Sequence, residues 1–305
     1  MGGSFKGALL RGRGGRGKIA EVLLTLPTAV WLVVFFVVPS ALIFAISFRT
    51  SDPAGGIGAE WTLRTLKSVA ESNYLVILWR TVWVSAVSAA ACILLAVPTG
   101  YFIAGLSRRR RQWLLLLLIL PLWTNFLIRI FAWRLVLHPD GVLRGALLAM
   151  GMPDNVYLLN NTGAVIVVTV YTFLPFAILP IYAAAEKFNF SLLEAARDLG
   201  ASRFKAFYSV FLPGIRRGIL SAVLIVFVPA LGSYAIPDLV GGISSELIGN
   251  KIALRAMGNR NMPEAAAYAA ILAIIILAPI AAALVFNRRS VKAFLRARVS
   301  GGVED

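Results

Sequence analysis

An uncharged stretch from Leu23 to Phe48 constrains this chain more than any other feature of its sequence. It runs for 26 residues, whereas a helix needs about 20 residues to cross about 30 Å of hydrocarbon. A secretory signal peptide is the competing interpretation, because basic residues precede the stretch. The stretch is too long for such a peptide, and no small-x-small cleavage pattern closes it, so we expect a retained spanning helix.

The composition extends this expectation to the whole chain. Of its 305 residues, 59% are hydrophobic and 14% are charged, and the mean hydropathy is +0.81. We therefore predict an all-α membrane protein with six transmembrane helices, between a basic N-terminal segment (1–22) and a C-terminal tail (288–305). The expected spans within this transmembrane domain (23–287) are 23–48, 75–106, 112–137, 163–185, 214–236 and 265–287.

The basic residues predict how these spans are oriented. Lys and Arg in short loops are retained in the cytoplasm. The N-terminal segment has five, the 107–111 loop four, the 186–218 loop six and the C-terminal tail five, against seven in the opposite loops. Both termini are therefore expected to be cytoplasmic. The same distribution explains the net charge of +16 without nucleic-acid binding, because these residues flank spans and face anionic lipid headgroups.

The sequence offers no candidate for catalysis. Cys92 is the single cysteine and His138 the single histidine, so a cysteine-based metal site is excluded and no cluster for acid–base or metal chemistry is recognisable. The chain also lacks the G-x-x-x-x-G-K-[ST] loop that binds ATP. We predict a chain that is not an enzyme and that has no catalytic residue, metal site or bound cofactor of its own.

The long loop between the fourth and fifth predicted spans has the pattern of a helix, a turn and a second helix. Ser191 is predicted to N-cap the first helix with Glu194 in capping-box register, and Gly200 is suited to end it. A second short helix is expected from Ser202, stopping before Pro213 because the residue that precedes a proline avoids the α region.

This loop, residues 191–213, resembles the EAA loop of ABC importer permeases. The matching residues are Glu194-Ala195-Ala196, Gly200 and Val210-Phe211-Leu212-Pro213, with Val210 where the family has Ile. The resemblance implies that the loop inserts into a groove on an ATPase subunit, which binds the ATP and Mg. The residues it implicates in coupling are Glu194, Ala195, Ala196, Asp198, Gly200, Leu212 and Pro213.

Three further segments resemble the spermidine/putrescine permease branch, and within it the first of two paralogous permeases. They are Trp123–Trp133, Tyr171–Pro180 and Pro229–Gly242. The resemblance implies a six-helix subunit of the type I ABC importer (MetI-like) permease fold in a bacterial inner membrane. Its implied partners are a second permease, two ATPase subunits and a periplasmic solute-binding protein, and its implied solute is a polyamine.

Polar residues beside helix-breaking prolines mark the expected solute path, because irregular backbone at membrane depth lines cavities or is buried in protein. The alternative for the aromatic members is a belt at the membrane interface, and for Arg129 a side chain that snorkels to it. The candidates are Trp123, Thr124, Asn125, Arg129, Tyr171, Thr172, Ser233, Tyr234 and Asp238.

The identity of the solute stays open at this stage. Polyamine permeases often have Glu where this chain has Ser233, and related systems transport opines, amino-acid derivatives or phosphonates. A channel or a secondary transporter is a further alternative, since either needs polar helix breaks but no ATPase. The EAA-type loop argues against both.

Overall fold

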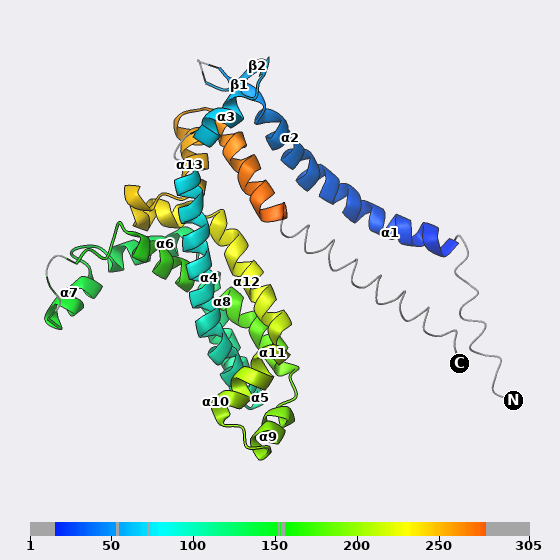
Figure 1. Cartoon of the computed structure of the whole chain (residues 1–305), viewed down its shortest axis with the longest axis vertical. Helices are drawn as coiled ribbons and strands as arrows, with labels where there is room; N and C mark the ends of the chain where they lie inside the picture. Colours follow the sequence, from blue (N-terminus) through cyan, green and yellow to red (C-terminus); the bar gives the residue numbers. More distant parts are fainter. Residues whose placement is uncertain (1–15, 53–54, 72–73, 152, 154–155, 279–305) are drawn as a thin grey trace.

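Three apolar helices form the centre of the molecule. In the computed structural model, which describes residues 16–52, 55–71, 74–151, 153 and 156–278, these are α4 (Tyr74–Ala104), α8 (Thr162–Glu186) and α12 (Arg216–Leu231). They pack against one another along their length (Figure 1). Because α4 has 31 residues and α8 has 25, each is long enough to cross a bilayer.

Small residues let these helices approach closely. A Cβ added at Gly218 of α12 would lie 2.5 Å from Ala184 Cβ and 2.8 Å from the carbonyl oxygen of Pro180 in α8. A Cβ at Gly100 of α4 would lie 2.9 Å from Ile181 Cγ2. Close backbone approach is how helices associate in lipid, where burying apolar surface supplies no driving force.

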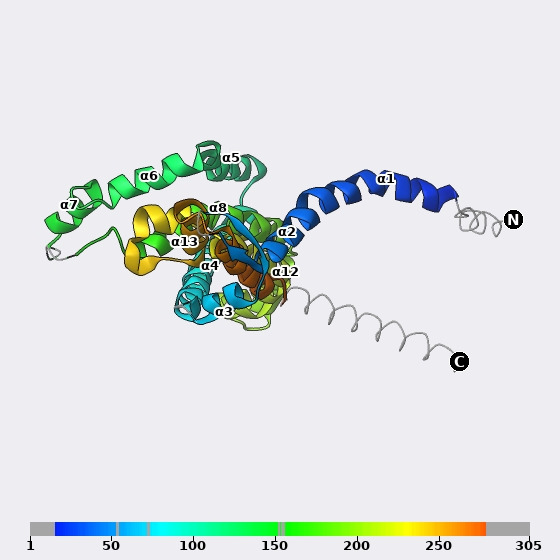
Figure 2. The same cartoon turned by 90° about the horizontal axis from the view of Figure 1, so that it is seen from above.

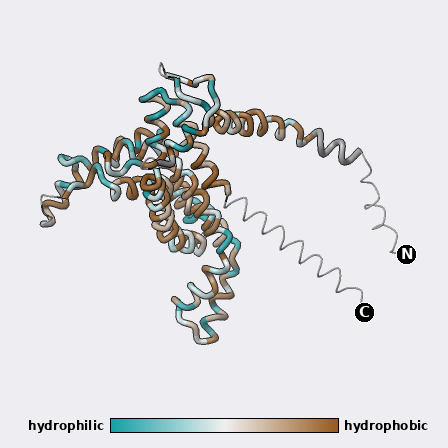
Figure 3. The backbone as a smooth tube through the Cα atoms, turned by 45° about the horizontal axis from the view of Figure 1, so that its top comes forward, coloured by the Kyte–Doolittle hydropathy of each residue, from teal (hydrophilic) through white to brown (hydrophobic). Residues whose placement is uncertain are grey.

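The first predicted span is a helix that stands apart from this bundle. A continuous helical run is made of α1 (Arg16–Leu32), a π turn (η1, Val33–Val37) and α2 (Val38–Ile46), and its residues 24–46 are apolar enough to cross a membrane. No part of its most apolar window is buried by the described chain, and both views show it leaving the bundle (Figures 1 and 2). Hydrophobic residues run along its length (Figure 3), which suits contact with lipid or with another membrane subunit.

The third predicted span is not one helix. The structure has α5 (Arg108–Ile119), a 3₁₀ turn (η2, Leu120–Trp123) and α6 (Phe126–Val136), with a bend of 90° between them. Thr124 is extended, and the Asn125 side chain accepts hydrogen bonds from the N–H groups of Leu127 (2.8 Å) and Ile128 (3.4 Å). A continuous helix at 112–137 is therefore wrong, because Asn125 starts a new helix in a different direction.

The fifth span is preceded by a second bend. The segments α10 (Arg203–Ala206), a π turn (η3, Phe207–Phe211) and α11 (Leu212–Gly214) form one helical run that meets α12 at 70°. The prediction that this run stops before Pro213 is wrong. Pro213 lies in the first turn of α11, directly after the π turn, where a missing N–H is tolerated.

Within the part of the chain that the structure describes, three unbroken helices are long and apolar enough to cross a membrane, namely residues 24–46, α4 and α8. The number is five if each bent pair counts as one span. A shorter apolar helix, Met262–Ala278, begins the sixth predicted span, and the rest of that span lies outside the described residues. The mostly helical architecture is confirmed and is compatible with six spans.

Loops gather at the two ends of the bundle (Figure 1). One end has the antiparallel pair β1 (Arg49–Ser51) and β2 (Ile57–Trp61), then α3 (Arg64–Glu71) and α13 (Ile248–Ala253). The other has α5, α9 (Ser191–Asp198) and α10. An ion pair of 3.0 Å between Arg111 and Glu186 joins the two loops predicted to be cytoplasmic. The remaining short segments are α7 (Val142–Ala149), η4 (Pro237–Gly241), η5 (Ile243–Ser245) and η6 (Leu254–Gly258).

Substituting Gly218→Val tests the close packing of α8 and α12. The new side chain meets backbone and Cβ atoms that cannot move aside, so we expect overpacking of about 1–3 kcal/mol and a lower thermal unfolding temperature in detergent. Gly105→Ala is the control, because its Cβ would have no neighbour nearer than 3.7 Å. Equal unfolding temperatures for the two variants would contradict this account.

Candidate functional site

The turn between α9 and α10 has the geometry of a helix C-cap built on glycine. Gly200 has φ of +88°, and its N–H donates to the carbonyl oxygen of Arg197 at 2.9 Å. The N–H of Ala201 donates to the carbonyl oxygen of Ala196 at 3.0 Å. These two bonds are a Schellman motif with Gly200 at C′, so the predicted role of Gly200 in ending the first helix is confirmed.

Of the two N-caps predicted for the loop helices, one is confirmed and one is wrong. Ser202 caps α10 as predicted, since its hydroxyl accepts a hydrogen bond from the N–H of Lys205 at 3.2 Å. Ser191 does not cap α9. Instead Asn189 Oδ1 accepts from the N–H of Ser191 (3.1 Å) and from its hydroxyl (2.8 Å), and Phe190 is the N-cap residue. The predicted capping box with Glu194 is therefore wrong, because Asn189 supplies the acceptor two residues earlier.

A cluster of aromatic rings fixes the loop to the bundle. Phe211 is fully buried, and its ring centroid lies 4.9 Å from Tyr101 of α4, 5.3 Å from Phe188, 6.4 Å from Phe190 and 5.2 Å from Phe207. The contacts with Tyr101 and Phe188 are edge-to-face, which is the geometry that aromatic pairs prefer. The predictions used Phe211 only as part of a motif. Its spacing of four from Phe207 was the available signal for an anchoring role.

The residues predicted to couple to an ATPase lie on the outer surface of the loop. Glu194, Ala195, Asp198, Gly200 and Pro213 are exposed, while Ala196 and Leu212 are partly buried against the bundle. Beside them, large apolar side chains are exposed at Leu199 (89%) and Phe204 (78%). The structure brings these residues to one end of the molecule (Figure 1), and their role in coupling stays a prediction.

The first group of predicted path residues surrounds the 90° bend. Trp123, Thr124 and Asn125 are exposed, with Thr124 Oγ1 donating to the Pro121 carbonyl oxygen at 2.7 Å and Asn125 capping α6. These polar groups therefore stabilise the bend itself. Arg129, one turn along α6, has a buried Nε with no hydrogen-bond partner in the described part of the chain.

The second group lies on α8, and its two members face different surroundings. Tyr171 is 37% exposed and meets Trp133 of α6 edge-on at 5.2 Å. Thr172 is 4% exposed, and its hydroxyl donates to the carbonyl oxygen of Val168 at 2.7 Å. Thr172 therefore faces the packed interior, whereas Tyr171 is partly exposed, and a role for either in the solute path stays a prediction.

The third group follows α12, with Ser233 and Tyr234 in a non-helical break and Asp238 in the π turn η4 (Pro237–Gly241). Ser233 is partly buried, and Tyr234 and Asp238 are exposed. The carbonyl oxygen of Tyr234 accepts from Asn250 Nδ2 at 3.2 Å and from the N–H of Asp238 at 3.0 Å. These bonds give hydrogen-bond partners to the Tyr234 carbonyl oxygen, which lies in a break between helices. A backbone group at membrane depth needs such partners within the protein.

The structure brings the elements that contain these three groups together. Short segment η4 contacts both α6 and α8, and buried side chains of all three share one apolar cluster, including Ile130, Val168 and Val240. This packing brings Ile130 and Val240, which are far apart in the sequence, into one cluster. Across the described ranges, no group of three or more His, Cys, Asp or Glu side chains is placed to hold a metal ion.

Comparison with known proteins identifies the family. The family model of the binding-protein-dependent transport system inner membrane component matches residues 96–296. The spermidine/putrescine transport system permease protein PotB of Haemophilus influenzae is 37% identical over 234 residues, covering 76% of this chain and 82% of that protein. PotB of Escherichia coli K12 is 37% identical over 246 residues, covering 80% and 90%.

A solved structure shows the same fold. It is a bacterial alginate ABC transporter in complex with an alginate pentasaccharide-bound periplasmic protein, with a TM-score of 0.69 and 18% identity over 90% of this chain and 95% of the matched chain. This chain therefore belongs to the inner membrane components of binding-protein-dependent transport systems. It is a multi-pass permease and not an enzyme, and it works with an ATPase and a periplasmic binding protein.

Substituting Phe211→Ala tests how the loop is held. Removing a fully buried ring costs about 3–5 kcal/mol, and we expect α9 and α10 to detach from the end of α4. Hydrogen exchange of residues 191–213 should then accelerate while exchange in α4 and α8 is unchanged. The matched control is Phe204→Ala, since that ring is 78% exposed and its loss should leave exchange as it was. Equal protection in both variants would refute the anchoring role.

Proposed function

We propose that this chain and a second permease subunit form the translocation path of an ABC importer for a polyamine such as spermidine or putrescine. The observation that carries the proposal is the 37% identity to spermidine/putrescine permeases over as much as 80% of this chain. The polar residues around α6, α8 and η4 supply a path between elements that pack together.

The chemistry of this path fits a cationic solute. Asp238 presents an exposed carboxylate, and the rings of Tyr171, Trp133 and Tyr234 lie on the same three segments. Ammonium groups bind carboxylates through charge-assisted hydrogen bonds and aromatic faces through cation–π contacts. An extended polyamine would be held at several points of this kind and passed between them.

A second class of solute is favoured by one observation. Arg129 has a buried Nε without a hydrogen-bond partner among the described residues, and Ser233 offers a hydroxyl where a carboxylate would attract a cation. A guanidinium in the path suits a solute that contains a carboxylate or phosphonate, such as an opine or an amino-acid derivative. The alternative is the same importer with a different solute.

Energy is supplied by two ATPase subunits in this proposal. They bind ATP and Mg on the cytoplasmic side, and their closure moves residues 191–213. The exposed surface of the loop, with Glu194, Leu199 and Phe204, would enter a groove on the ATPase, while the Phe211 cluster passes the movement to α4 and α8. The excess of Lys and Arg in this loop, in the 107–111 loop and in both terminal segments supports placing them, and both termini, in the cytoplasm.

The uncovered helix of residues 24–46 is an observation in favour of a second permease subunit. A spanning helix that the rest of the described chain leaves uncovered can lie in lipid or cover the neighbouring subunit. The path itself is open on one side, because Trp123 is 75% exposed and Tyr234 is 48% exposed. A second permease would close that side.

Substituting Gly200→Pro tests the coupling role. Proline cannot adopt φ of +88°, so the cap is lost at a cost of more than about 3 kcal/mol, and we expect uptake by membranes containing the assembled importer to be abolished. Gly151→Pro is the matched control. Gly151 has φ of +89°, and its N–H donates to the carbonyl oxygen of Leu148 at 3.0 Å, but it lies outside the loop.

Both variants should insert into the membrane at the wild-type level. Loss of uptake in Gly200→Pro alone supports coupling through the loop. Unchanged uptake in Gly200→Pro, with the ATPase still bound, would remove residues 191–213 from the mechanism.

Uptake of labelled solutes tests the identity of the cargo. Cells that lack this chain should lose uptake of spermidine and putrescine, and cells complemented with the wild-type chain should regain it. Unlabelled opines and amino acids serve as competitors. Intact polyamine uptake in the deletion strain would exclude the polyamine and favour the second class of solute. Gradient-driven uptake by the purified chain alone in liposomes would exclude an ABC importer.

A further inference from the structure

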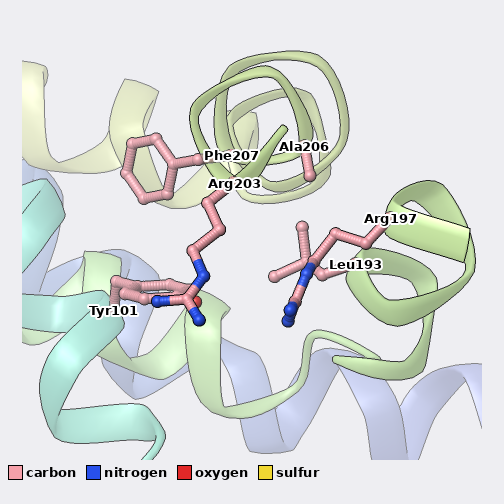
Figure 4. A pocket seen from close by; sticks show the side chains of 6 residues that line it. All are labelled: Tyr101, Leu193, Arg197, Arg203, Ala206 and Phe207. Carbon is pink, nitrogen blue, oxygen red and sulfur yellow. The ribbon is translucent and has the colours of Figure 1, made fainter. Parts of the chain in front are cut away.

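A basic pocket lies between the two loop helices and the end of α4. Its volume is about 230 Å³, and its walls are Tyr101, Leu193, Arg197, Arg203, Ala206 and Phe207. Figure 4 shows Arg203 of α10 extending its guanidinium group toward the Tyr101 ring and Arg197 of α9 extending its guanidinium group past Leu193, both at the wall of this space. Leu193, Ala206 and the ring of Phe207 make the rest of the wall apolar.

Neither guanidinium forms an ion pair within the described part of the chain. Arg111 pairs with Glu186 at 3.0 Å and Arg255 with Glu264 at 3.1 Å, so other arginines of this protein use the carboxylates near them. Glu194 and Asp198 line the adjoining hollow together with the two pocket arginines, yet form no ion pair with them among the described residues. Two cations that share one pocket repel each other unless an anion lies between them.

The shape of the pocket favours a phosphate group as that anion. Guanidinium groups bind phosphate oxygens in a bidentate manner, and a phenol hydroxyl can donate a further hydrogen bond. Pockets for drug-sized ligands begin at about 300 Å³. The space therefore holds a phosphate and the first atoms of its ester, while a larger remainder of the molecule would lie outside.

The position of the pocket gives two sources for this phosphate. Tyr101 lies in the last turn of α4, which ends at Ala104, and tyrosines at the ends of spans lie at the level of the lipid headgroups. A phospholipid headgroup can therefore reach the pocket from the membrane. Soluble phosphate can reach it from the aqueous side.

We propose that Arg197 and Arg203 bind a phosphate group, which holds α9 against α10 and both against the end of α4. Within the described chain no ion pair joins α9 to α10, so the anion supplies a link that the protein lacks. Its consequence rests on the proposed function of the loop: an occupied pocket makes residues 191–213 a stiffer unit for passing on the movement of the ATPase.

The test uses the importer purified with all its subunits, in nanodiscs of phosphatidylcholine with or without phosphatidylglycerol. Native mass spectrometry counts the phospholipid of either kind that stays bound, and calorimetry measures binding of inorganic phosphate to the importer in detergent free of phospholipid. We expect the Arg197→Gln/Arg203→Gln double variant to bind the preferred probe at least about tenfold more weakly than the wild type. Lys205→Gln, which removes a charge from the same helix outside the pocket, should bind it as the wild type does.

The two probes separate the two sources. Arginine-dependent retention of either phospholipid assigns the site to a lipid headgroup, and arginine-dependent binding of inorganic phosphate without such retention assigns it to soluble phosphate. Equal binding by the double variant and the wild type in both arms overturns the proposal. Binding that occurs only after the ATPase subunits are removed also overturns it, because a carboxylate of the ATPase would then fill the pocket.

A conservative variant and an uptake assay complete the design. Arg197→Lys/Arg203→Lys keeps both charges but loses the bidentate geometry, so it should bind between the wild type and the glutamine variant, which excludes a simple folding defect. These binding measurements do not depend on the solute. A failure of the polyamine proposal would therefore leave them unchanged, whereas wild-type uptake by the double variant would refute only the stiffening of the loop.

Discussion

The structure depends on one constraint, which is that backbone N–H and C=O groups at membrane depth must be bonded within the protein. Two breaks in the helices meet it with a local device. Asn125 caps α6 at the 90° bend, and Asn250 donates to the Tyr234 carbonyl oxygen in the segment after α12. Both breaks adjoin the predicted path residues.

A second dependence links the membrane bundle to the loop outside it. Ring contacts around Phe211 join Tyr101 of α4 and Phe188 at the end of α8 to the π turn of residues 207–211. The close approach at Gly218 joins α12 to α8. These contacts connect the loop to the three central helices, and the opposite surface of the loop is exposed at Leu199 and Phe204.

The loop also shows why its two sides have different chemistry. Its outer surface exposes Leu199 and Phe204, which suits an apolar protein groove. Between α9, α10 and α4 lie Arg197 and Arg203, which form no ion pair among the described residues and suit a small anion. Glu194 and Asp198 line a hollow together with both arginines, so an anion bound there would lie next to the surface proposed to meet the ATPase.

The sequence by itself determined the membrane class, the EAA-type loop, the Gly200 cap and the family, because these follow from local hydropathy, spacing and motif identity. It did not determine that the third span bends at Asn125, that Asn189 replaces Ser191 in capping, or that Thr172 faces the interior while Tyr171 does not. Nor could it place Arg197 and Arg203 beside Tyr101. The two asparagine caps are local bonds that compete with the caps and helices that the pattern favours. The positions of Thr172, Tyr171 and the two arginines were decided by the tertiary structure, because they depend on which distant segment packs against each side chain.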